Sequence, residues 1–415
     1  MADYVIIGNG AAALGCIEGI RQIDRETPVT VISAEPYPAY CRPLISYALE
    51  GKASPENRNA RPADFYEKNG CEVLYGKKAV RIDPDGHTVT LGDGQILPYK
   101  KLCVAAGSSP FVPPMTGLDT VERKFSFMTM DDMLALDRAA APESRVLIVG
   151  AGLIGLKCAE GLAEKVKSIT VCDLAPRVLS SILDEEGAAL MQAKLEEHGI
   201  AFLLGDTAER FEEDRAVMKS GKTAEFDILV LAVGVRANTA LIKESGGNVN
   251  RGIVTDTGMR TSLPDIYAAG DCAEGYDSSV GANRVLAILP NARMQGECAG
   301  VNMAGGDRVF DNAVPMNAIG FFGLHALCAG RSLAPEEDGE ILAERGPGWV
   351  KKFYVKDNRL VGFALVGREE RAGIYTSLIR EKVPLDTVDF DLLRHSATTA
   401  AFPADMRRQK FGGAV

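Results

Sequence analysis

The sequence lacks the signals of several large classes of protein. Its nine cysteines never stand in a C-x-x-C pair and its four histidines show no ligand spacing, so we expect neither a metal site nor a disulfide framework. Most of these cysteines are expected to be buried as small apolar side chains. No apolar run reaches the about 18 residues that a membrane span needs. The chain enters an apolar strand pattern at once, without a basic segment and cleavage site, which favours a cytoplasmic protein with no membrane partner.

The sequence also lacks an excess of positive charge, with 46 lysines and arginines against 56 aspartates and glutamates. The net charge is −10 and the sequence pI is about 5.2, which argues against nucleic acid as a partner. With 415 residues the chain exceeds the about 250 to 300 at which a single core stops growing, so we expect two or three domains. The 43 glycines indicate many tight turns.

The first motif lies near the start of the chain, in the segment VIIGNGAAALGCIEGI. An apolar strand is followed by Gly8 and Gly10 and then by helix-forming residues. In this pattern Gly8 allows a tight turn, Gly10 lets backbone N–H groups approach a pyrophosphate, and the small Ala13 lets the helix pack on the strand. The next strand, PVTVISAE, leads to Glu35, where a carboxylate accepts the ribose hydroxyls of a dinucleotide.

The same pattern occurs again in VLIVGAGLIGLKCAEGL. Gly150, Gly152 and Gly155 follow a second apolar strand, and the strand after them ends at Asp173. Two matches with the correct strand context predict an α/β protein with two Rossmann-like domains that bind two dinucleotides. The alternative is an α/β core with glycine-rich turns and no ligand.

Two similar crossings divide the chain. The segment KLCVAAGSSPFVPP, residues 101–114, is an apolar strand that ends in a Gly-Ser turn and a proline-rich stretch. The segment FDILVLAVGVRANTAL, residues 226–241, makes a parallel crossing on the way back. Because the second glycine motif lies between them, we expect an inserted domain over residues 117–240 and a discontinuous first domain over residues 1–116 and 241–318.

The order of these motifs is GxGxxA, A-A-G, GxGxxG, V-G and then A-G-D. It resembles the FAD-dependent pyridine nucleotide oxidoreductases of the glutathione-reductase-like superfamily, over essentially the whole chain. The resemblance implies that the first turn holds FAD, that the second holds NAD(P)H, and that Asp271 binds the ribityl and phosphate part of the flavin. The predicted cofactor-binding residues are Gly8, Gly10, Ala11, Ala12, Glu35, Arg42, Pro43, Ala105, Ala106, Gly107, Gly150, Gly152, Leu153, Ile154, Gly155, Asp173, Gly234, Gly270, Asp271 and Asn291.

Three further segments narrow the resemblance. As a whole the chain is similar to rubredoxin and ferredoxin reductases, to the NADH-binding part of nitrite reductase and to the NADH-reacting subunit of phenylglyoxylate dehydrogenase. PYPAYCRPLISYALEGK is similar to a Y-x-R-P-x-L-S element whose arginine, here Arg42, lies along the FAD pyrophosphate. ILPNARMQGECAGVNMAGG matches the family's helix whose N-terminus faces the N1/C2 carbonyl edge of the flavin. VKKFYVKDNRLVGFALVG, with a hairpin turn at Asp357 and Asn358, is similar to the small third domain of these relatives. It implies a C-terminal α+β domain with a tail over residues 319–415.

Two departures from the family bear on mechanism. The redox cysteine pair of the disulfide reductases is missing after Glu35, and alignment on the shared LEG places Pro43 rather than Cys41 at the position of a single redox cysteine. Electrons are therefore expected to leave from the flavin itself, with a redox role for Cys41 as the alternative. Many relatives also carry a lysine–glutamate pair beside flavin N5, and these positions hold Tyr47 and Lys157 here.

Lys157 has two interpretations. As a catalytic residue near the flavin, it would raise the flavin potential by favouring negative charge on the reduced ring. As a structural residue, it would lie along its helix and pair with Glu160, three residues further on.

The resemblance also sets the expected reaction. Asp173 favours NADH, because a carboxylate accepts the ribose 2′-hydroxyl and repels a 2′-phosphate, whereas Arg177 is the residue through which NADPH would be accepted. We expect hydride transfer from NADH to N5 of FAD, then electron transfer to a rubredoxin- or ferredoxin-like protein or to a partner subunit. The alternatives are an NADH oxidase or peroxidase that uses Cys41, and an FAD-bound interaction subunit without catalysis. A homodimer is left open.

Overall fold

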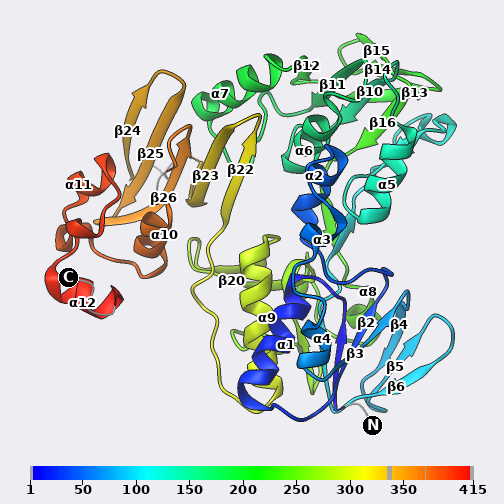
Figure 1. Ribbon diagram of the computed structural model, residues 1–415, viewed down its shortest axis with the longest axis vertical. Coiled ribbons are helices and arrows are strands. Elements are labelled where there is room, and N and C mark those ends of the chain that lie inside the picture. The colour runs from blue at the N-terminus through cyan, green and yellow to red at the C-terminus, as the bar shows by residue number, and fades with distance from the viewer. Residues whose placement is uncertain (1–2, 334–338, 370, 412–415) are drawn as a thin grey trace. The chain divides into compact units, whose positions relative to one another are not determined.

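The computed structural model describes residues 3–333, 339–369 and 371–411 (Figure 1). The chain divides into two compact units, each built from segments that are separate in the sequence. Within the described residues, no helix combines the length and the apolar character needed to cross a membrane. Unit 1 comprises Met1–Pro113, Phe125–Ala139 and Val233–Ala313, and unit 2 comprises Pro114–Lys124, Ala140–Ala232 and Val314–Val415.

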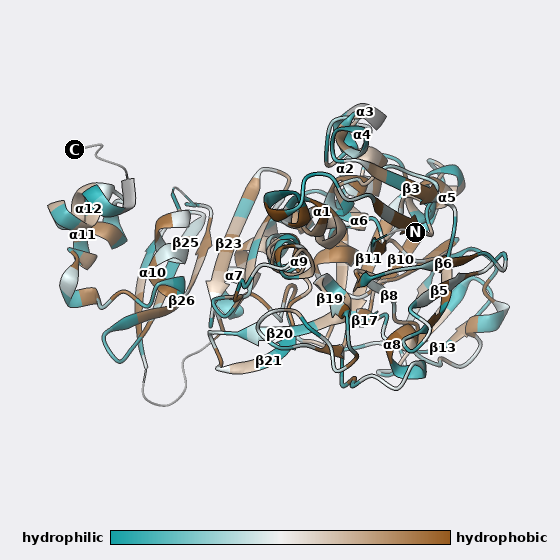
Figure 2. Cartoon of the chain, turned by 90° about the horizontal axis from the view of Figure 1, so that it is seen from below, coloured by the Kyte–Doolittle hydropathy of each residue, from teal (hydrophilic) through white to brown (hydrophobic). Residues whose placement is uncertain are grey.

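Unit 1 is built around a parallel sheet in the strand order β19-β7-β1-β2-β3. β1 and β2 are apolar and buried along their whole length, as in strands covered on both faces, and the strand that starts at the N-terminus is brown in Figure 2. The carboxyl ends of these strands meet at one edge of the sheet, where ligands bind in such folds. The strands are β1 (Tyr4–Ile7), β2 (Val29–Ser33), β3 (Cys71–Tyr75), β7 (Lys101–Val104) and β19 (Ile266–Ala268).

Two helices of unit 1, α1 (Ala11–Ile23) and α9 (Leu289–Met303), cross at backbone contact. A Cβ atom on Gly296 would lie 1.9 Å from the carbonyl oxygen of Ala12, which leaves room only for glycine. At three more glycines, an added Cβ atom would lie 2.1 to 2.2 Å from a carbonyl oxygen of the other helix. The crossing therefore places the first turn of α1 against the first turns of α9. The four glycines are Gly15, Gly19, Gly296 and Gly300.

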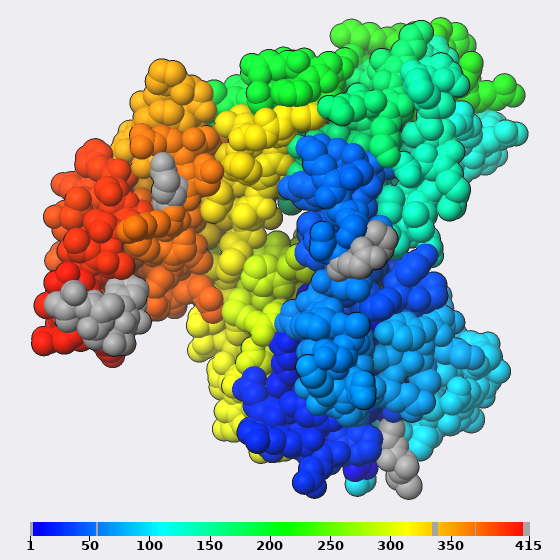
Figure 3. Space-filling model, viewed as in Figure 1, coloured from blue at the N-terminus to red at the C-terminus, as the bar shows by residue number. Residues whose placement is uncertain are grey.

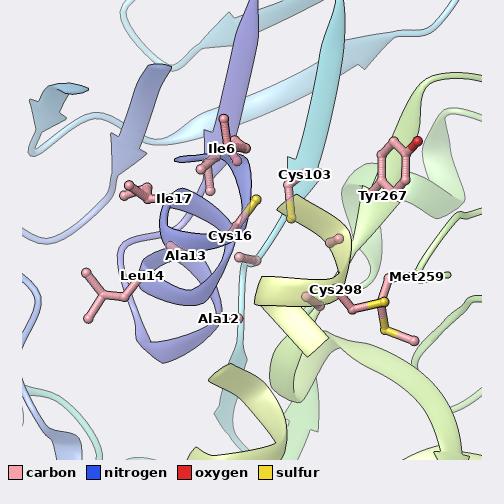
Figure 4. Close-up of a cluster of buried hydrophobic side chains, with 14 of the residues drawn as sticks. Ile6, Ala12, Ala13, Leu14, Cys16, Ile17, Cys103, Met259, Tyr267 and Cys298 are labelled. Atoms are coloured by element: carbon pink, nitrogen blue, oxygen red, sulfur yellow. The ribbon is translucent and has the colours of Figure 1, made fainter. Parts of the chain in front are cut away.

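The core between α1 and the sheet contains cysteine side chains (Figure 4). Cys16 from α1 and Cys103 from β7 are fully buried, and their mutual hydrogen bond together with burial raises the pKa of the Cys103 thiol. All nine cysteines are free thiols and seven of them are buried, which confirms that most serve as small apolar side chains.

The remaining elements of unit 1 surround the parallel sheet. One antiparallel sheet contains β4 (Ala79–Asp83), β5 (Thr88–Leu91) and β6 (Ile96–Pro98), and a second small sheet contains β18 (Ile253–Val254), β20 (Ala273–Asp277) and β21 (Ala282–Val285). β8 (Ser108–Pro110) pairs with β17 (Val235–Ala237). The short helices are η1 (Arg42–Leu44), α2 (Ile45–Leu49), α3 (Pro55–Arg58), α4 (Phe65–Lys68), α5 (Met130–Ala139), α8 (Ala240–Glu244) and η3 (Gly270–Cys272).

Unit 2 contains a second sheet in the order β12-β11-β10-β16-β9, whose first four strands are parallel neighbours. The succession β10, α6, β11 repeats that of β1, α1, β2 in unit 1. Its elements are η2 (Leu118–Thr120), β9 (Lys124–Phe125), β10 (Arg145–Val149), α6 (Leu153–Leu162), β11 (Ser168–Asp173), α7 (Glu185–Glu196), β12 (Ile200–Leu204) and β16 (Ile228–Leu231), with a three-stranded sheet of β13 (Ala208–Glu212), β14 (Arg215–Met218) and β15 (Thr223–Glu225).

The C-terminal part of unit 2 is an antiparallel sheet in the order β22-β23-β26-β25-β24, with helices that share an apolar core with it. The predicted hairpin turn at Asp357 and Asn358 is confirmed, because both residues have positive φ and join β25 to β26. The elements are β22 (Met316–Phe321), β23 (Leu324–Gly330), β24 (Glu340–Gly346), β25 (Trp349–Lys356), β26 (Arg359–Val366), α10 (Gly373–Arg380), η4 (Leu385–Thr387), α11 (Phe390–His395), η5 (Thr399–Ala401) and α12 (Ala404–Phe411).

The architecture confirms the predicted α/β class with two Rossmann-like sheets and a C-terminal α+β region. The division into three domains stays a prediction. In the structure, residues 125–139 group with unit 1, and the C-terminal region groups with residues 140–232 in unit 2. The last part of the predicted tail, residues 412–415, lies outside the described residues.

Candidate dinucleotide sites

The first glycine turn joins β1 to α1. Gly8 has φ +109°, and a Cβ atom there would lie 2.1 Å from the carbonyl oxygen of Ala105, so this position requires glycine. Gly10 caps α1 without a side chain, and among the described residues no atom beyond its chain neighbours lies within 4 Å of where its Cβ would be. The helix begins at Ala11 and Ala12, so its first N–H groups point toward a space that suits a phosphate.

A cluster of polar side chains lies beyond the end of β2. Arg42, in η1 with Pro43, donates from Nη2 to Oε1 of Glu35 over 2.5 Å and from Nη1 to the carbonyl oxygen of Met128 over 3.0 Å. The hydroxyl of Tyr40 donates to Oε2 of Glu35 over 2.6 Å, and burial raises the pKa of Tyr40. The structure thus brings together the predicted ribose acceptor and the predicted pyrophosphate arginine. Tyr40 belongs to the same sequence element but was not predicted as a site residue.

Asp271 lies in η3, directly after β19. Its Oδ2 accepts a hydrogen bond from the hydroxyl of Ser108 over 3.3 Å. Burial raises the pKa of Asp271, while the Ser108 hydrogen bond and the positive charge of Arg42 oppose that shift. A carboxylate with this little solvation gains from a ligand that donates hydroxyl groups, as a ribityl chain does.

Gln295 holds the turn that carries Asp271, a contact that the sequence reasoning missed. It is fully buried in α9, and its Oε1 accepts the backbone N–H of Gly270 over 2.8 Å. Gly270 has φ +81°, and a Cβ atom there would lie 2.9 Å from the Cβ of Ala12. The turn that carries Asp271 is therefore held between α1 and α9. The segment ILPNARMQGECAGVNMAGG, which contains Gln295, is predicted as a helix whose N-terminus faces the flavin, and no local pattern marks the glutamine as a partner of Gly270.

The start of α9 offers a second helix N-terminus to the same region of unit 1. Ile288 caps the helix without a side-chain hydrogen bond, Pro290 stands in the first turn, and Asn291 is fully buried. Two helix N-termini without side-chain caps, one arginine and a glycine turn with open space form a donor set that fits an anionic dinucleotide. The residues of unit 1 therefore fit FAD.

The two crossings of unit 1 are paired as β8 and β17. Gly107 has φ +66° and Gly234 has φ +118°, so glycine is needed where each crossing leaves its strand. Asn238 ties them together, since its side chain donates to the carbonyl oxygen of Ala106 over 2.9 Å and its backbone N–H to that of Gly107 over 3.0 Å.

The second glycine turn reproduces the geometry of the first. Gly150 has φ +118°, and a Cβ atom on Gly155 would lie 2.0 Å from the carbonyl oxygen of Gly150. Gly152 caps α6 without a side chain and with open space around it, and the helix starts at Leu153 and Ile154. Unit 2 therefore holds its own helix N-terminus suited to a phosphate.

Asp173, at the end of β11, is tied to this turn. Its Oδ2 accepts the backbone N–H of Ala151 over 2.7 Å, and its Oδ1 accepts that of Ala175 over 2.8 Å. A carboxylate has about four acceptor positions, so it can still accept a ribose hydroxyl. Arg177 donates to the carbonyl oxygens of Leu183 and Ser180, so its guanidinium is already bonded within its own loop.

Lys157 pairs as its structural interpretation predicts. Its Nζ lies 2.5 Å from Oε2 of Glu160, donates to the carbonyl oxygen of Gly320 over 2.6 Å, and stands 5.0 Å from the centre of the Phe321 ring. All of these residues belong to unit 2. The ammonium is thus held by the C-terminal sheet, and the catalytic interpretation stays a hypothesis.

Cys41 has the surroundings of a structural residue. It precedes η1, and burial raises the pKa of its thiol, which disfavours the thiolate that redox chemistry requires. Across the described ranges, no group of three or more histidine, cysteine, aspartate or glutamate side chains is arranged to hold a metal ion.

Comparison with known sequences identifies the class. The chain belongs to the pyridine nucleotide-disulphide oxidoreductase family, whose sequence profile matches residues 2–296. This finding confirms the family predicted from the order of the glycine motifs.

Individual relatives extend the match beyond residue 296. The epsilon subunit of NADH-dependent phenylglyoxylate dehydrogenase from Aromatoleum evansii is 33% identical over 393 residues, which are 92% of each chain. The assimilatory nitrate reductase electron transfer subunit of Bacillus subtilis (strain 168) is 31% identical over 386 residues, covering 91% of this chain but 49% of that protein. This chain therefore spans about half the length of that relative.

A solved structure has the same fold. The chain resembles one in the covalent putidaredoxin reductase–putidaredoxin complex with a TM-score of 0.85 and 24% identity, covering 96% of this chain and 97% of the other. At this identity the likeness establishes the fold.

Proposed function

We propose that the protein is an FAD-dependent NADH oxidoreductase that passes electrons to a small redox protein or to a partner subunit. The observation that carries the proposal is the pair of strand–glycine–helix turns with the same backbone geometry, one in each unit. FAD, when bound, supplies the chemistry, since it accepts a hydride and releases electrons to an acceptor.

In this proposal unit 1 is the FAD unit. Gly8 and Gly10 open the N-terminus of α1 to the pyrophosphate, and Arg42 supplies the compensating positive charge. Glu35 accepts the ribose hydroxyls and keeps its bond with Tyr40. Asp271 accepts from the ribityl hydroxyls. The uncapped N-terminus of α9 stabilises negative charge placed near it.

Unit 2 would bind the nicotinamide nucleotide. The N-terminus of α6 at Gly152 binds the pyrophosphate, and Asp173 accepts a ribose hydroxyl. The choice of NADH over NADPH is supported by two features. The carboxylate of Asp173 repels a 2′-phosphate, and Arg177 is engaged by main-chain carbonyls.

The relatives and the cysteines support the proposed acceptor class. A partner-subunit role matches the names of the phenylglyoxylate dehydrogenase and nitrate reductase relatives, and a small redox protein matches the putidaredoxin complex. A disulfide relay has no support, because the cysteines nearest to Cys41 in the sequence are Cys16 and Cys71, which leaves no cysteine pair after Glu35. The cytoplasm, which contains NADH and keeps thiols reduced, is the compartment that this activity fits.

The test is anaerobic stopped flow on the FAD-loaded protein. We expect stoichiometric NADH to bleach the flavin absorbance rapidly, and NADPH to bleach it much more slowly. Reoxidation is then followed with rubredoxin, ferredoxin, oxygen and peroxide in turn, and we expect rubredoxin or ferredoxin to react fastest. Absence of bleaching by both nucleotides would refute the enzyme proposal, and fastest reoxidation by peroxide would favour a Cys41 peroxidase. Sedimentation of the same sample tests for a homodimer.

A further inference from the structure

The nucleotide-binding helix α6 carries two charged side chains on the face that meets the C-terminal sheet. Lys157 and Glu160 stand two and five residues after Gly155, the last glycine of the second turn. Only 16% of the Lys157 side chain and 11% of the Glu160 side chain are exposed. Charges this deeply buried are costly unless they are fully bonded, so their partners show what they hold in place.

Both side chains bind the same hairpin, one at the end of β22 and the other in the turn that leads to β23. The Nζ of Lys157 donates to the carbonyl oxygen of Gly320 over 2.6 Å, and the backbone N–H of Phe322 donates to Oε1 of Glu160 over 2.7 Å. The two side chains are joined to each other over 2.5 Å. In Figure 3 the yellow atoms of this hairpin lie beside the green atoms of unit 2.

The turn itself has an unusual backbone. Phe322 has φ +48° and Gly323 has φ +84°, which is the pattern of a two-residue hairpin turn that normally carries asparagine or glycine first. A phenylalanine there is strained and persists only because its surroundings hold it. Its ring stacks on His198 with the ring centres 3.9 Å apart and the planes 6° apart. His198 follows α7, so the turn is fastened to both helices.

A second set of ion pairs also joins the C-terminal sheet to residues 140–232 of unit 2. Lys352 of β25 is buried and pairs with Asp184 and Glu186 at the start of α7, and Arg345 of β24 also binds Glu186, over 2.7 Å. The C-terminal sheet is therefore attached to this part of unit 2 at α7 as well as at α6.

We infer that Lys157 and Glu160 are positioning residues for the nicotinamide nucleotide. They fix the 320–323 turn against α6 and so hold the helix whose N-terminus, at Gly152, faces the pyrophosphate. The inference rests on the proposed function of unit 2. It assigns the positive charge at position 157 to holding this turn and not to the flavin.

The experiment compares K157M and E160Q with the FAD-loaded wild type. We expect each variant to raise the KM for NADH by about threefold to tenfold, with kcat within about twofold of wild type, because binding and not chemistry is weakened. The affinity for ADP-ribose, measured by calorimetry, should fall by the same factor. The double variant should be no worse than either single one, since the two residues act as a unit. K157R should recover most of the affinity.

Lys194 provides a matched control. It forms the same i,i+3 pair, with Glu197 at the C-cap of α7 over 3.1 Å, and within the described residues its side chain bonds to no residue of β22 or β23. K194M should leave both constants unchanged. Unchanged ADP-ribose affinity in folded K157M and E160Q would overturn the inference, and so would a shift of the flavin potential in K157M with KM unaltered. If wild type itself binds no ADP-ribose and is not reduced by NADH, it is the proposed function that fails.

Discussion

Gly296→Ala tests whether the close crossing of α1 and α9 holds the FAD end of unit 1. The added methyl would lie 1.9 Å from the carbonyl oxygen of Ala12, whereas ordinary contact begins at 3.4 Å. This oxygen belongs to the helix backbone and cannot rotate away as a side chain does. The two helices must therefore separate by roughly the difference, and Gly15, Gly19 and Gly300 lose their contacts as well.

The size of the effect follows from two opposing contributions. Alanine is favoured over glycine inside a helix by about 1 kcal/mol. Overpacking costs about 1 to 3 kcal/mol, and we take the upper end because the obstacle is backbone on both sides. The expected net loss is about 2 kcal/mol. If this loss destabilises the FAD-bound state relative to the free protein, the apparent Kd for FAD rises about thirtyfold.

The assay follows flavin fluorescence during thermal unfolding and during dilution of the FAD-loaded protein. We expect earlier flavin release and a lower midpoint for Gly296→Ala than for wild type. Gly373→Ala is the matched control, because Gly373 is exposed in α10 and nothing lies within 4 Å of its Cβ position. If Gly296→Ala unfolds and binds FAD like the wild type, the backbone contact between α1 and α9 does not exist as described.

Three further variants test unit 1. Gln295→Leu removes the acceptor of the Gly270 N–H, and since an unmet buried donor costs about 1 to 3 kcal/mol, FAD affinity should fall about tenfold or more by fluorescence titration; equal affinity would contradict its role. Asp271→Asn should change the stability of the apoprotein and the affinity for FAD in opposite directions. Burial raises the Asp271 pKa above its ordinary 3.8, so the wild-type apoprotein loses stability as pH rises through the raised value. Urea unfolding should show no such loss for the variant. The variant should nevertheless bind FAD more weakly than wild type. After reduction with NADH, Cys41→Ser should be reoxidised by peroxide at the same rate as wild type in stopped flow, because the raised pKa of Cys41 disfavours the thiolate that a peroxidase needs; slower reoxidation would revive the redox cysteine.

The features that the sequence predicted are those with a local pattern. Gly8 and Gly150 stand in short motifs whose spacing encodes a strand, a tight turn and a helix, and both have the positive φ that such a turn requires. The hairpin at Asp357 and Asn358 was likewise predicted from two adjacent residues that tolerate a left-handed backbone. Local chemistry determines these features, so a single sequence suffices to find them.

Contacts between distant segments left no such pattern. Gln295 meets Gly270 25 residues away, and Lys157 meets Gly320 163 residues away. Each depends on how two elements pack, which no spacing within either element reveals. Arg42 and Glu35 are an intermediate case. Both residues were predicted to bind the cofactor, but the bond between them was not predicted. The sequence therefore predicted which residues are important, but not which residues they bind within the protein.

The contact between α1 and α9 also sets an order of events during synthesis. The last residue of α1, Ile23, and the first residue of α9, Leu289, are 266 positions apart in the sequence. At about 5 to 20 residues per second, a ribosome needs about 13 to 53 s to make the intervening chain. Throughout that interval the glycine face of α1 has no α9 to cover it, whereas β10, α6 and β11 emerge as one continuous segment. We therefore expect residues 140–232 to become compact on the ribosome before unit 1 does, and FAD to be captured only after α9 has emerged.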